Sequence, residues 1–135
     1  MTKDDLQQIL ADAFAPWVQA LELTVVETAP DSTVLRMPVT PALARVGGIV
    51  SGQALMALAD TAMVLGAMSH AGRMLPLATT DLHCQFLRPG NGAAILCRAQ
   101  LVKPGRALSV WRAEMTDEAS GKLVATATAT FYLPA

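Results

Sequence analysis

The residues best suited to chemistry in this sequence are Gly52 and Asp60, which lie in the stretch GGIVSGQALMALADTAM. The glycine opens a predicted helix, where backbone N–H groups have no intrahelical partner and the helix dipole is positive. Because glycine has no side chain, a ligand atom can approach its N–H closely. Gly52 therefore offers the fixed donor that an oxyanion hole needs. The alternative is that it only permits tight packing of the helix against the preceding loop.

Asp60 is the one carboxylate in a long, nearly apolar segment. Such an acid can act as a general base on water, or attack a carbonyl carbon directly. It must be ionised in either role. Apolar surroundings raise the pKa of a carboxyl group, whereas hydrogen bonds and helix-end dipoles lower it. The alternative is a structural Asp60 that caps a loop or pairs with an arginine.

Gly52 and Asp60 are eight residues apart, which corresponds to about 12 Å along a helix axis. Two groups at that separation cannot both contact one reacting carbon within one subunit. If two central helices pack antiparallel in a two-fold dimer, Gly52 of one chain can approach Asp60 of the other. Such an interface would contain two equivalent sites.

The flanking sequence predicts the elements that position these residues. Thr2 or Asp4 can cap a first helix that ends near Pro16, and Ser51 can cap the central one. The turn APDS lies between two strand-like segments and predicts a hairpin. The predicted elements are a helix over 2–14, strands over 21–28 and 33–39, a loop over 40–48, a helix from Ser51 to about Ser69, and strands over 77–88, 93–102, 107–118 and 122–133.

The order of these elements predicts an α+β fold in one domain over residues 1–135. Strands in a run, rather than alternating with helices, indicate an antiparallel sheet. The last four strands are predicted to form a meander with the turns PGNG, KPGR and EASG. Because the central helix is apolar almost all round, a curved sheet is expected to enclose it.

Composition narrows the function classes. The chain is 53% hydrophobic and 16% charged, which predicts self-association because a small domain cannot bury so much apolar surface alone. A net charge of −1 gives no electrostatic case for nucleic acid. Asp60 argues against a membrane span, since a central acid costs roughly 2.5–3.5 kcal/mol on insertion scales. The acidic start MTKDDLQQIL has no apolar signal segment, so a cytoplasmic protein is expected.

Cysteine and histidine usage predicts neither a disulfide framework nor a metal centre. Cys84 and Cys97 are symmetric about PGNG, and a simple hairpin would place them opposite each other within disulfide reach. A cytoplasmic location favours reduced, buried thiols instead. Neither His70 nor His83 has a second ligand at zinc spacing, so we expect no metal and no redox cofactor.

The order of elements and the run GGIVSGQALMALADTA resemble the hotdog-fold thioesterases of the PaaI-like group, which hydrolyse acyl-CoA thioesters. The segments TTDLHCQFLRPG and VKPGRALSVWRAEMTDEASGKLVATATATFYL also resemble that family, so the likeness covers nearly the whole chain. The family's pattern is Asn-x-x-Gly-x-x-His-Gly-Gly, followed by seven residues that end in Asp. Counted from that Asp, Asp60 and Gly52 match the active-site positions, and Gly48 matches the earlier glycine.

Three positions depart from that pattern, because Arg45 replaces the Asn, Ser51 the His and Gln53 the second glycine. In the family the Asn helps to orient the thioester, and the His precedes the glycine whose N–H binds the carbonyl. The backbone donor and the carboxylate remain, and Gly48 and Gln53 are expected to lie at the bound substrate. Arg45 could contact a substrate carboxylate or carbonyl, or be a solvent-facing charge. Ser51 could place its hydroxyl near the thioester or be a plain N-cap, and it lacks the Gly-x-Ser-x-Gly elbow.

The resemblance also implies roles outside the helix. In the family a small hydroxyl residue at the position of Thr79 helps to hold the attacking water, although ordinary β-propensity also explains a threonine there. Because strand side chains alternate, Thr79 is expected to share a face with Asp81. The phosphates of CoA could meet Arg88, Lys103 or Arg106 near the strand turns, unless these are simply solvated charges.

The resemblance implies hydrolysis of an acyl-CoA or aryl-CoA thioester by a homodimer, or by a dimer of dimers. One alternative is a non-catalytic acyl-CoA binder, which the replacements at Ser51 and Arg45 suggest. Another is an enoyl-thioester hydratase, which would need a histidine on the central helix or its lead-in, where His70 lies at the far end. A phosphate loop at VGGIVSG is disfavoured, because it lacks the Lys-Ser/Thr pair and a βαβ context.

Overall fold

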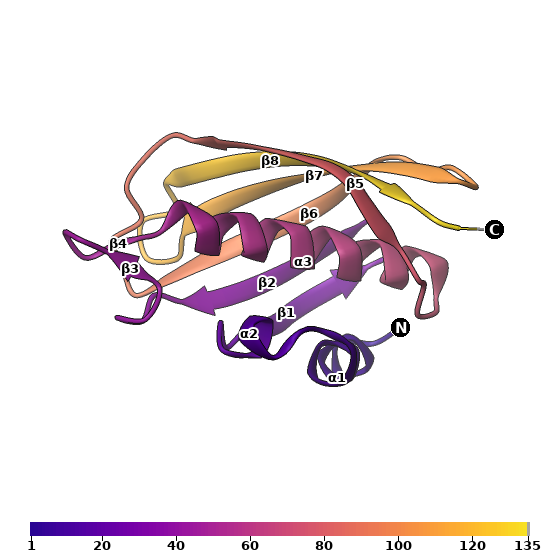
Figure 1. The fold of residues 1–135 in the computed structure, drawn as a ribbon, viewed down its shortest axis with the longest axis horizontal. Coiled ribbons are helices and arrows are strands. Elements are labelled where there is room, and N and C mark those ends of the chain that lie inside the picture. The colour runs from indigo at the N-terminus through magenta and orange to yellow at the C-terminus, as the bar shows by residue number, and fades with distance from the viewer. Residues whose placement is uncertain (135) are drawn as a thin grey trace.

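A curved, six-stranded antiparallel sheet wraps around one long helix in the computed structural model, which describes residues 1–134 (Figure 1). The strand order is β1-β2-β6-β7-β8-β5, and every pair is antiparallel. The predicted α+β class is confirmed. The elements are α1 (Lys3–Ala13), α2 (Pro16–Gln19), β1 (Thr24–Ala29), β2 (Ser32–Pro38), β3 (Ala44–Arg45), β4 (Ile49–Val50), α3 (Gly52–Ala71), β5 (Ala78–Phe86), β6 (Ala94–Lys103), β7 (Leu108–Asp117) and β8 (Leu123–Tyr132).

The first helix begins with a reciprocal cap. Thr2 Oγ1 accepts a hydrogen bond from the N–H of Asp5 at 3.1 Å, and Asp5 Oδ2 accepts one from the N–H of Thr2 at 2.8 Å. Of the two predicted caps, Thr2 is therefore the one used. Pro16 does more than end α1, because it opens the short α2, where a proline ring suits the first helical turn. This second helix was not predicted, since one turn of helix leaves no periodic pattern.

The segment 40–48 was predicted to be a loop, and this prediction is wrong in part. It contains β3, which pairs with β4 in a small hairpin. Gly47 and Gly48 form its turn with φ angles of +99° and +76°, a region that side-chain-bearing residues rarely adopt. Directly after the hairpin, the Ser51 N–H donates to the Leu43 carbonyl at 2.8 Å. The hairpin thus fixes the point at which α3 begins.

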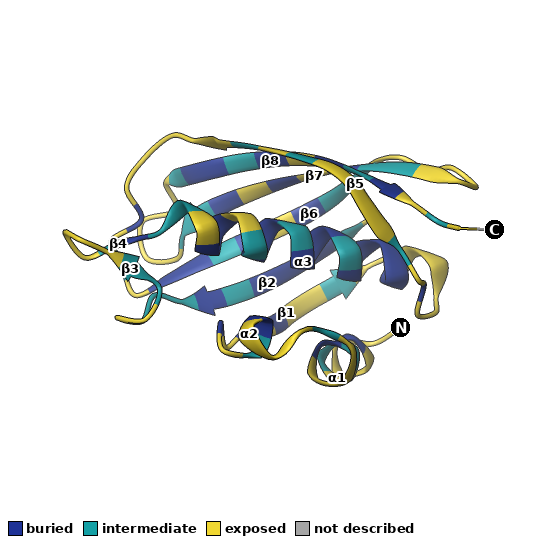
Figure 2. Cartoon of the chain, viewed as in Figure 1, coloured by how far each residue is buried: buried dark blue, intermediate teal, exposed yellow. Residues whose placement is uncertain are grey.

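The central helix matches its prediction to within two residues. Ser51 Oγ accepts a hydrogen bond from the N–H of Ala54 at 3.3 Å, and Gly72 ends the helix with a left-handed φ of +74°. By length and composition α3 could cross a membrane, but 61% of its apolar window is buried inside this structure. One stripe stays exposed or half-exposed (Figure 2). The stripe consists of Gln53, Met56, Ala57, Asp60 and Val64.

The predicted four-strand meander is only partly correct. Strands β6, β7 and β8 do form a meander, but β5 pairs with β8 at the far edge instead of with β6. Cys84 therefore lies opposite Ala127, whereas Cys97 lies opposite Met115 of β7, so the two are not opposite each other as a simple hairpin would place them. Both are free thiols, Cys97 buried and Cys84 half-buried. The connection after β5 is a crossover at the end of the sheet, where the N–H of Val50 donates to the Gly90 carbonyl at 2.9 Å.

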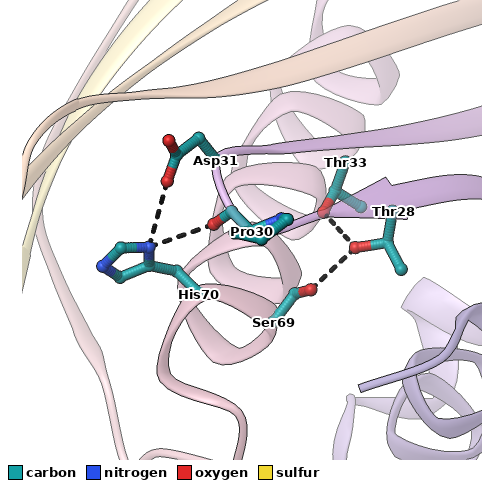
Figure 3. A network of polar contacts seen from close by, with 6 residues as sticks. All are labelled: Thr28, Pro30, Asp31, Thr33, Ser69 and His70. Atoms are coloured by element: carbon teal, nitrogen blue, oxygen red, sulfur yellow. Dashed lines mark hydrogen bonds and ion pairs between the residues drawn. The ribbon is translucent and has the colours of Figure 1, made fainter.

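A partly buried hydroxyl network ties the end of α3 to the β1–β2 hairpin (Figure 3). Thr28 Oγ1 lies 2.9 Å from Thr33 Oγ1 and 2.7 Å from Ser69 Oγ. One residue further along, His70 Nδ1 lies 3.3 Å from Asp31 Oδ1 and 3.0 Å from the carbonyl oxygen of the residue before Asp31. Together with the Ser51 cap at the other end, these contacts set the position of α3 along the sheet.

Gly66 lies against the indole of Trp111, the largest fully buried side chain of the core. A Cβ at Gly66 would come within 2.8 Å of Trp111 Cζ3. We predict that Gly66→Ala destabilises the fold, because overpacking typically costs about 1–3 kcal/mol and outweighs a helix-propensity gain of about 1 kcal/mol. Urea unfolding of Gly66→Ala, Trp111→Phe and the double variant measures this. The alanine should cost less beside the smaller phenylalanine ring, and an equal cost in both backgrounds would contradict the steric explanation.

Candidate active site

Asp60 and Thr79 meet where the exposed stripe of α3 faces the start of β5. The Thr79 hydroxyl donates to Asp60 Oδ1 at 2.9 Å. Desolvation by partial burial raises the pKa of Asp60, and the hydrogen bond from Thr79 opposes this shift without cancelling it. Among residues 1–134 Asp60 has no ion-pair partner, so the alternative of a structural Asp–Arg pair is not observed. Asp60 is therefore a carboxyl group with a raised pKa that accepts one hydrogen bond, from Thr79.

A β-bulge aims Thr79 at the helix. The register of β5 against β8 shifts between Thr79 and Asp81, and the extra residue, Thr80, turns its hydroxyl to the Thr130 carbonyl at 3.0 Å. Leu82 packs against the core, so its neighbour Asp81 points to the opposite face. The prediction that Thr79 and Asp81 share a face is therefore wrong, because strict alternation does not continue through a bulge.

Asp60 borders an apolar pocket of about 270 Å³. One of its walls is Trp17 of α2, whose side chain is 62% exposed. Sequence reasoning missed Trp17, because a single tryptophan in a four-residue helix gives no pattern that links it to a distant acid. Gln53, predicted to lie at the substrate, is also in this pocket. The remaining lining residues are Met56, Ala57 and Leu82.

Gly52 lines a second cleft, of about 350 Å³, at the start of α3. Within the described chain its N–H has no hydrogen-bond acceptor. A Cβ at Gly52 would lie 3.3 Å from Phe86 Cζ, so the glycine also permits close packing against β5. The N–H is therefore available as a donor, and the close packing that the glycine permits is against β5 and not against the preceding loop.

The Gly52 cleft also brings two of the predicted substrate-binding arginines together. Arg45 and Arg88 both line it. Arg45 is exposed and donates through Nη1 to the Val46 carbonyl at 3.0 Å, while Arg88 Nη1 donates to the Leu123 carbonyl at 2.6 Å. These bonds to backbone oxygens leave both guanidinium charges without a carboxylate partner among residues 1–134.

Three further predicted residues take other positions. Ser51 is the N-cap of α3, and its oxygen already accepts the N–H of Ala54. Gly48 lies in the β3–β4 turn, where an added Cβ would meet no other atom within 4 Å. Arg106 lies in the β6–β7 connection, at the opposite end of the molecule from the β3–β4 hairpin (Figure 1). The structure does not bring it to Gly52 of the same chain.

Neither histidine forms a hydrogen bond or an ion pair with Asp60 among residues 1–134. His70 lies at the end of α3 beside Asp31, and His83 is exposed on β5 opposite Thr128. No histidine lines the Asp60 pocket, which leaves the hydratase alternative without its acid/base group. In the part of the chain that the structure describes, no three His, Cys, Asp or Glu side chains are grouped so as to hold a metal ion.

The comparisons with known proteins agree on one class. A family model described as the acyl-CoA thioesterase N-terminal domain matches residues 35–132. A candidate esterase from Thermoplasma acidophilum is 27% identical over 131 residues, which cover 96% of each chain. Zebrafish thioesterase superfamily member 2 is 26% identical, with a TM-score of 0.88 and 99% of both chains covered. A mutant of the phenylacetic acid degradation protein PaaI from Thermus thermophilus is 31% identical, with a TM-score of 0.78, over 89% of this chain and 100% of that one.

The hydrogen bond from Thr79 predicts a change in the titration of Asp60. Thr79→Val removes a donor that favours the carboxylate, so the pKa of Asp60 should rise further above its ordinary value. Carboxyl ¹³C NMR of Asp60 across pH measures this. Thr80→Val is the matched control, because that hydroxyl donates to the Thr130 carbonyl and not to Asp60. An unchanged or lowered pKa in Thr79→Val would show that the hydrogen bond does not govern the titration.

Proposed function

This chain belongs to the acyl-CoA thioesterase family of hotdog-fold proteins, and we propose that it is a cytoplasmic hydrolase of acyl-CoA or aryl-CoA thioesters. Family membership supports hydrolysis of acyl-CoA thioesters in general. The observation that carries the proposal for this chain is the Asp60–Thr79 pair at the edge of an apolar pocket. The proposed reaction uses protein groups and water, and its only coenzyme is the CoA of the substrate.

Asp60 supplies the reactive carboxylate. As a general base it takes a proton from water while the water oxygen attacks the thioester carbon, and Thr79 holds that water beside it. The C–S bond then breaks, and the departing CoA thiolate takes up the proton. As a nucleophile, Asp60 instead attacks the same carbon, and the C–S bond breaks to release the CoA thiolate and leave an anhydride. Water then hydrolyses the anhydride to the free acid and the Asp60 carboxylate, and the proton that water loses goes to the thiolate. The raised pKa of Asp60 suits proton transfer, since a base works best when its pKa is near the working pH.

The carbonyl oxygen is polarised by the Gly52 N–H of a second subunit. Gly52 and Asp60 line separate pockets of one chain and are eight helical residues apart, about 12 Å by helix geometry. A two-fold pair of antiparallel α3 helices joins the two halves. Two features support such a dimer, which can pair further into a tetramer. One is the partly apolar stripe on α3, and the other is the edge strand β5, whose second side has no neighbouring strand among residues 1–134.

The two pockets suit the two parts of the substrate. The acyl group fits the apolar pocket beside Asp60, where Trp17 and Met56 form walls and Gln53 provides a polar edge. The CoA portion fits the Gly52 cleft, where Arg45 and Arg88 have no carboxylate partners. Ser51 and Gly48 contribute by holding the helix start and the turn before it. Arg106, in the β6–β7 connection at the opposite end of the molecule from the β3–β4 hairpin, would reach CoA only from the partner subunit.

Thiol release from a panel of acyl-CoA and aryl-CoA esters tests the activity. We expect turnover in the native protein and a loss of about 10²–10⁴-fold in kcat for Asp60→Asn, the range for a general base. Glu114→Gln, at an exposed acid on the outer face of β7, should keep full activity. Full activity in Asp60→Asn would disprove the mechanism. Tight binding of the esters without turnover would instead establish a non-catalytic acyl-CoA binder.

A single proline substitution at the start of α3 tests the role of the Gly52 N–H as a hydrogen-bond donor. Gly52→Pro removes the N–H, and proline suits the first helical position after an extended Ser51, which has φ −69° and ψ 150°. Gly52→Ala carries the same added Cβ beside Phe86 but keeps the N–H. We expect kcat to fall about 10²–10³-fold more in the proline variant than in the alanine variant. Equal activities would exclude the donor role.

Mixing inactive subunits tests the shared site. In a dimer of one Asp60→Asn chain and one Gly52→Pro chain, one of the two sites has both groups intact. An equal mixture refolded together should therefore recover about a quarter of the native activity, because half of the dimers are mixed and each has one good site. Each variant refolded alone is the control. No recovery from a mixture shown to contain mixed dimers would place both groups in one chain.

A further inference from the structure

A third cavity, of about 130 Å³, lies at the C-terminal end of α3 and belongs to neither half of the proposed active site. None of its described lining residues lines the Asp60 pocket or the Gly52 cleft. It opens between the last turns of α3, the lead-in to β5 and the β6–β7 connection. Its inner wall is mainly apolar and consists of Ala67, Leu75, Leu77, Leu101, Trp111 and Phe131, with Ser109 as a polar member.

The size and chemistry of this cavity suit a small hydrocarbon group. Apolar cavities of about 150 Å³ in other proteins stay free of water and bind ligands such as benzene. Trp111 and Phe131 are fully buried, so the inner wall is rigid. Its polar groups are few, namely the Ser109 hydroxyl and the Trp111 Nε1, which has no hydrogen-bond partner among the described residues. The inner part of the cavity therefore selects for an apolar body.

The rim of the cavity carries charged and polar side chains, and one of them, His70, already contacts the Asp31 carboxylate. Arg73 also lines the cavity, and Arg106 lies between two other lining residues, Gly105 and Ala107. Within residues 1–134, neither arginine side chain has a hydrogen bond or an ion pair. The negative end of the α3 dipole opposes an anion here, but Gly72 and Arg73 reduce this effect by donating their N–H groups to the last helical carbonyls.

We propose that this cavity binds a small apolar carboxylate. The hydrocarbon body occupies the space beside Trp111, and the carboxylate stays at the rim on Arg73, with Arg106 adding positive charge. A guanidinium suits this role, because its fork of N–H donors matches a carboxylate in two parallel hydrogen bonds. A neutral molecule of the same shape would gain only the apolar contacts.

Tryptophan fluorescence can follow binding at this cavity alone. The chain has two tryptophans, so Trp17→Phe leaves Trp111 as the single reporter and removes the one beside Asp60. Titration of this variant with sodium hexanoate should give a saturable change in emission. Hexanoate should bind about fivefold more tightly than hexan-1-ol, as expected for a partly exposed charge contact. Absence of a saturable change, or equal affinities for the acid and the alcohol, would overturn the proposal.

Further variants in the Trp17→Phe background locate the ligand. Arg73→Gln should remove the preference for hexanoate over hexan-1-ol, and Ala67→Met should abolish binding of both by filling the cavity. Arg112→Gln, on the exposed outer face of β7, should change neither affinity. Asp60→Asn should also bind hexanoate normally, which separates this cavity from the proposed active site. The proposal fails if Arg73→Gln keeps the preference, or if a folded Ala67→Met still binds.

Discussion

The rest of the structure depends on the incomplete enclosure of α3 by a single curved sheet. The sheet buries most of this apolar helix, including Leu58, Met63 and Leu65, which have no exposed surface. One side remains uncovered, because the sheet ends at the edge strand β5. Asp60 lies on that side. It is close enough to the core for its pKa to rise and open enough to meet a substrate.

The same arrangement makes the ionised Asp60 unfavourable for the stability of the fold. Since the pKa of Asp60 is raised in the folded chain, folding favours its protonated form. Its contribution to stability is therefore most favourable below the unfolded pKa, and it is lost as pH rises through the folded pKa. At neutral pH the ionised group weakens the fold, and the hydrogen bond from Thr79 reduces this penalty. A residue selected only for stability would be apolar or neutral at this position.

Local patterns in the sequence predicted the parts of the fold that local forces determine. The helix at Ser51, its N-cap and the β1–β2 hairpin all depend on neighbouring residues, and all three were predicted correctly. The position of β5 was not, because its pairing with β8 depends on contacts between residues far apart in the chain. For the same reason, the sequence did not predict that Trp17 lines the Asp60 pocket or that β5 has a bulge at Thr80. Asp60 and Gly52 could be proposed because both lie on one helix whose geometry is known in advance.

Two of the three departures from the family pattern, at Ser51 and Gln53, fall where the side chain matters less than the backbone. Serine at position 51 accepts the N–H of Ala54 and is a stronger N-cap than most residues, so it still fixes the first turn of α3. In the proposed reaction the thioester carbonyl contacts the backbone N–H of Gly52. Any well-capped helix has a free N–H at this position. Gln53 points to the exposed stripe, where a side chain can be accommodated. The proposed chemistry therefore requires a capped helix start and a carboxylate eight residues later, and both are present in this chain.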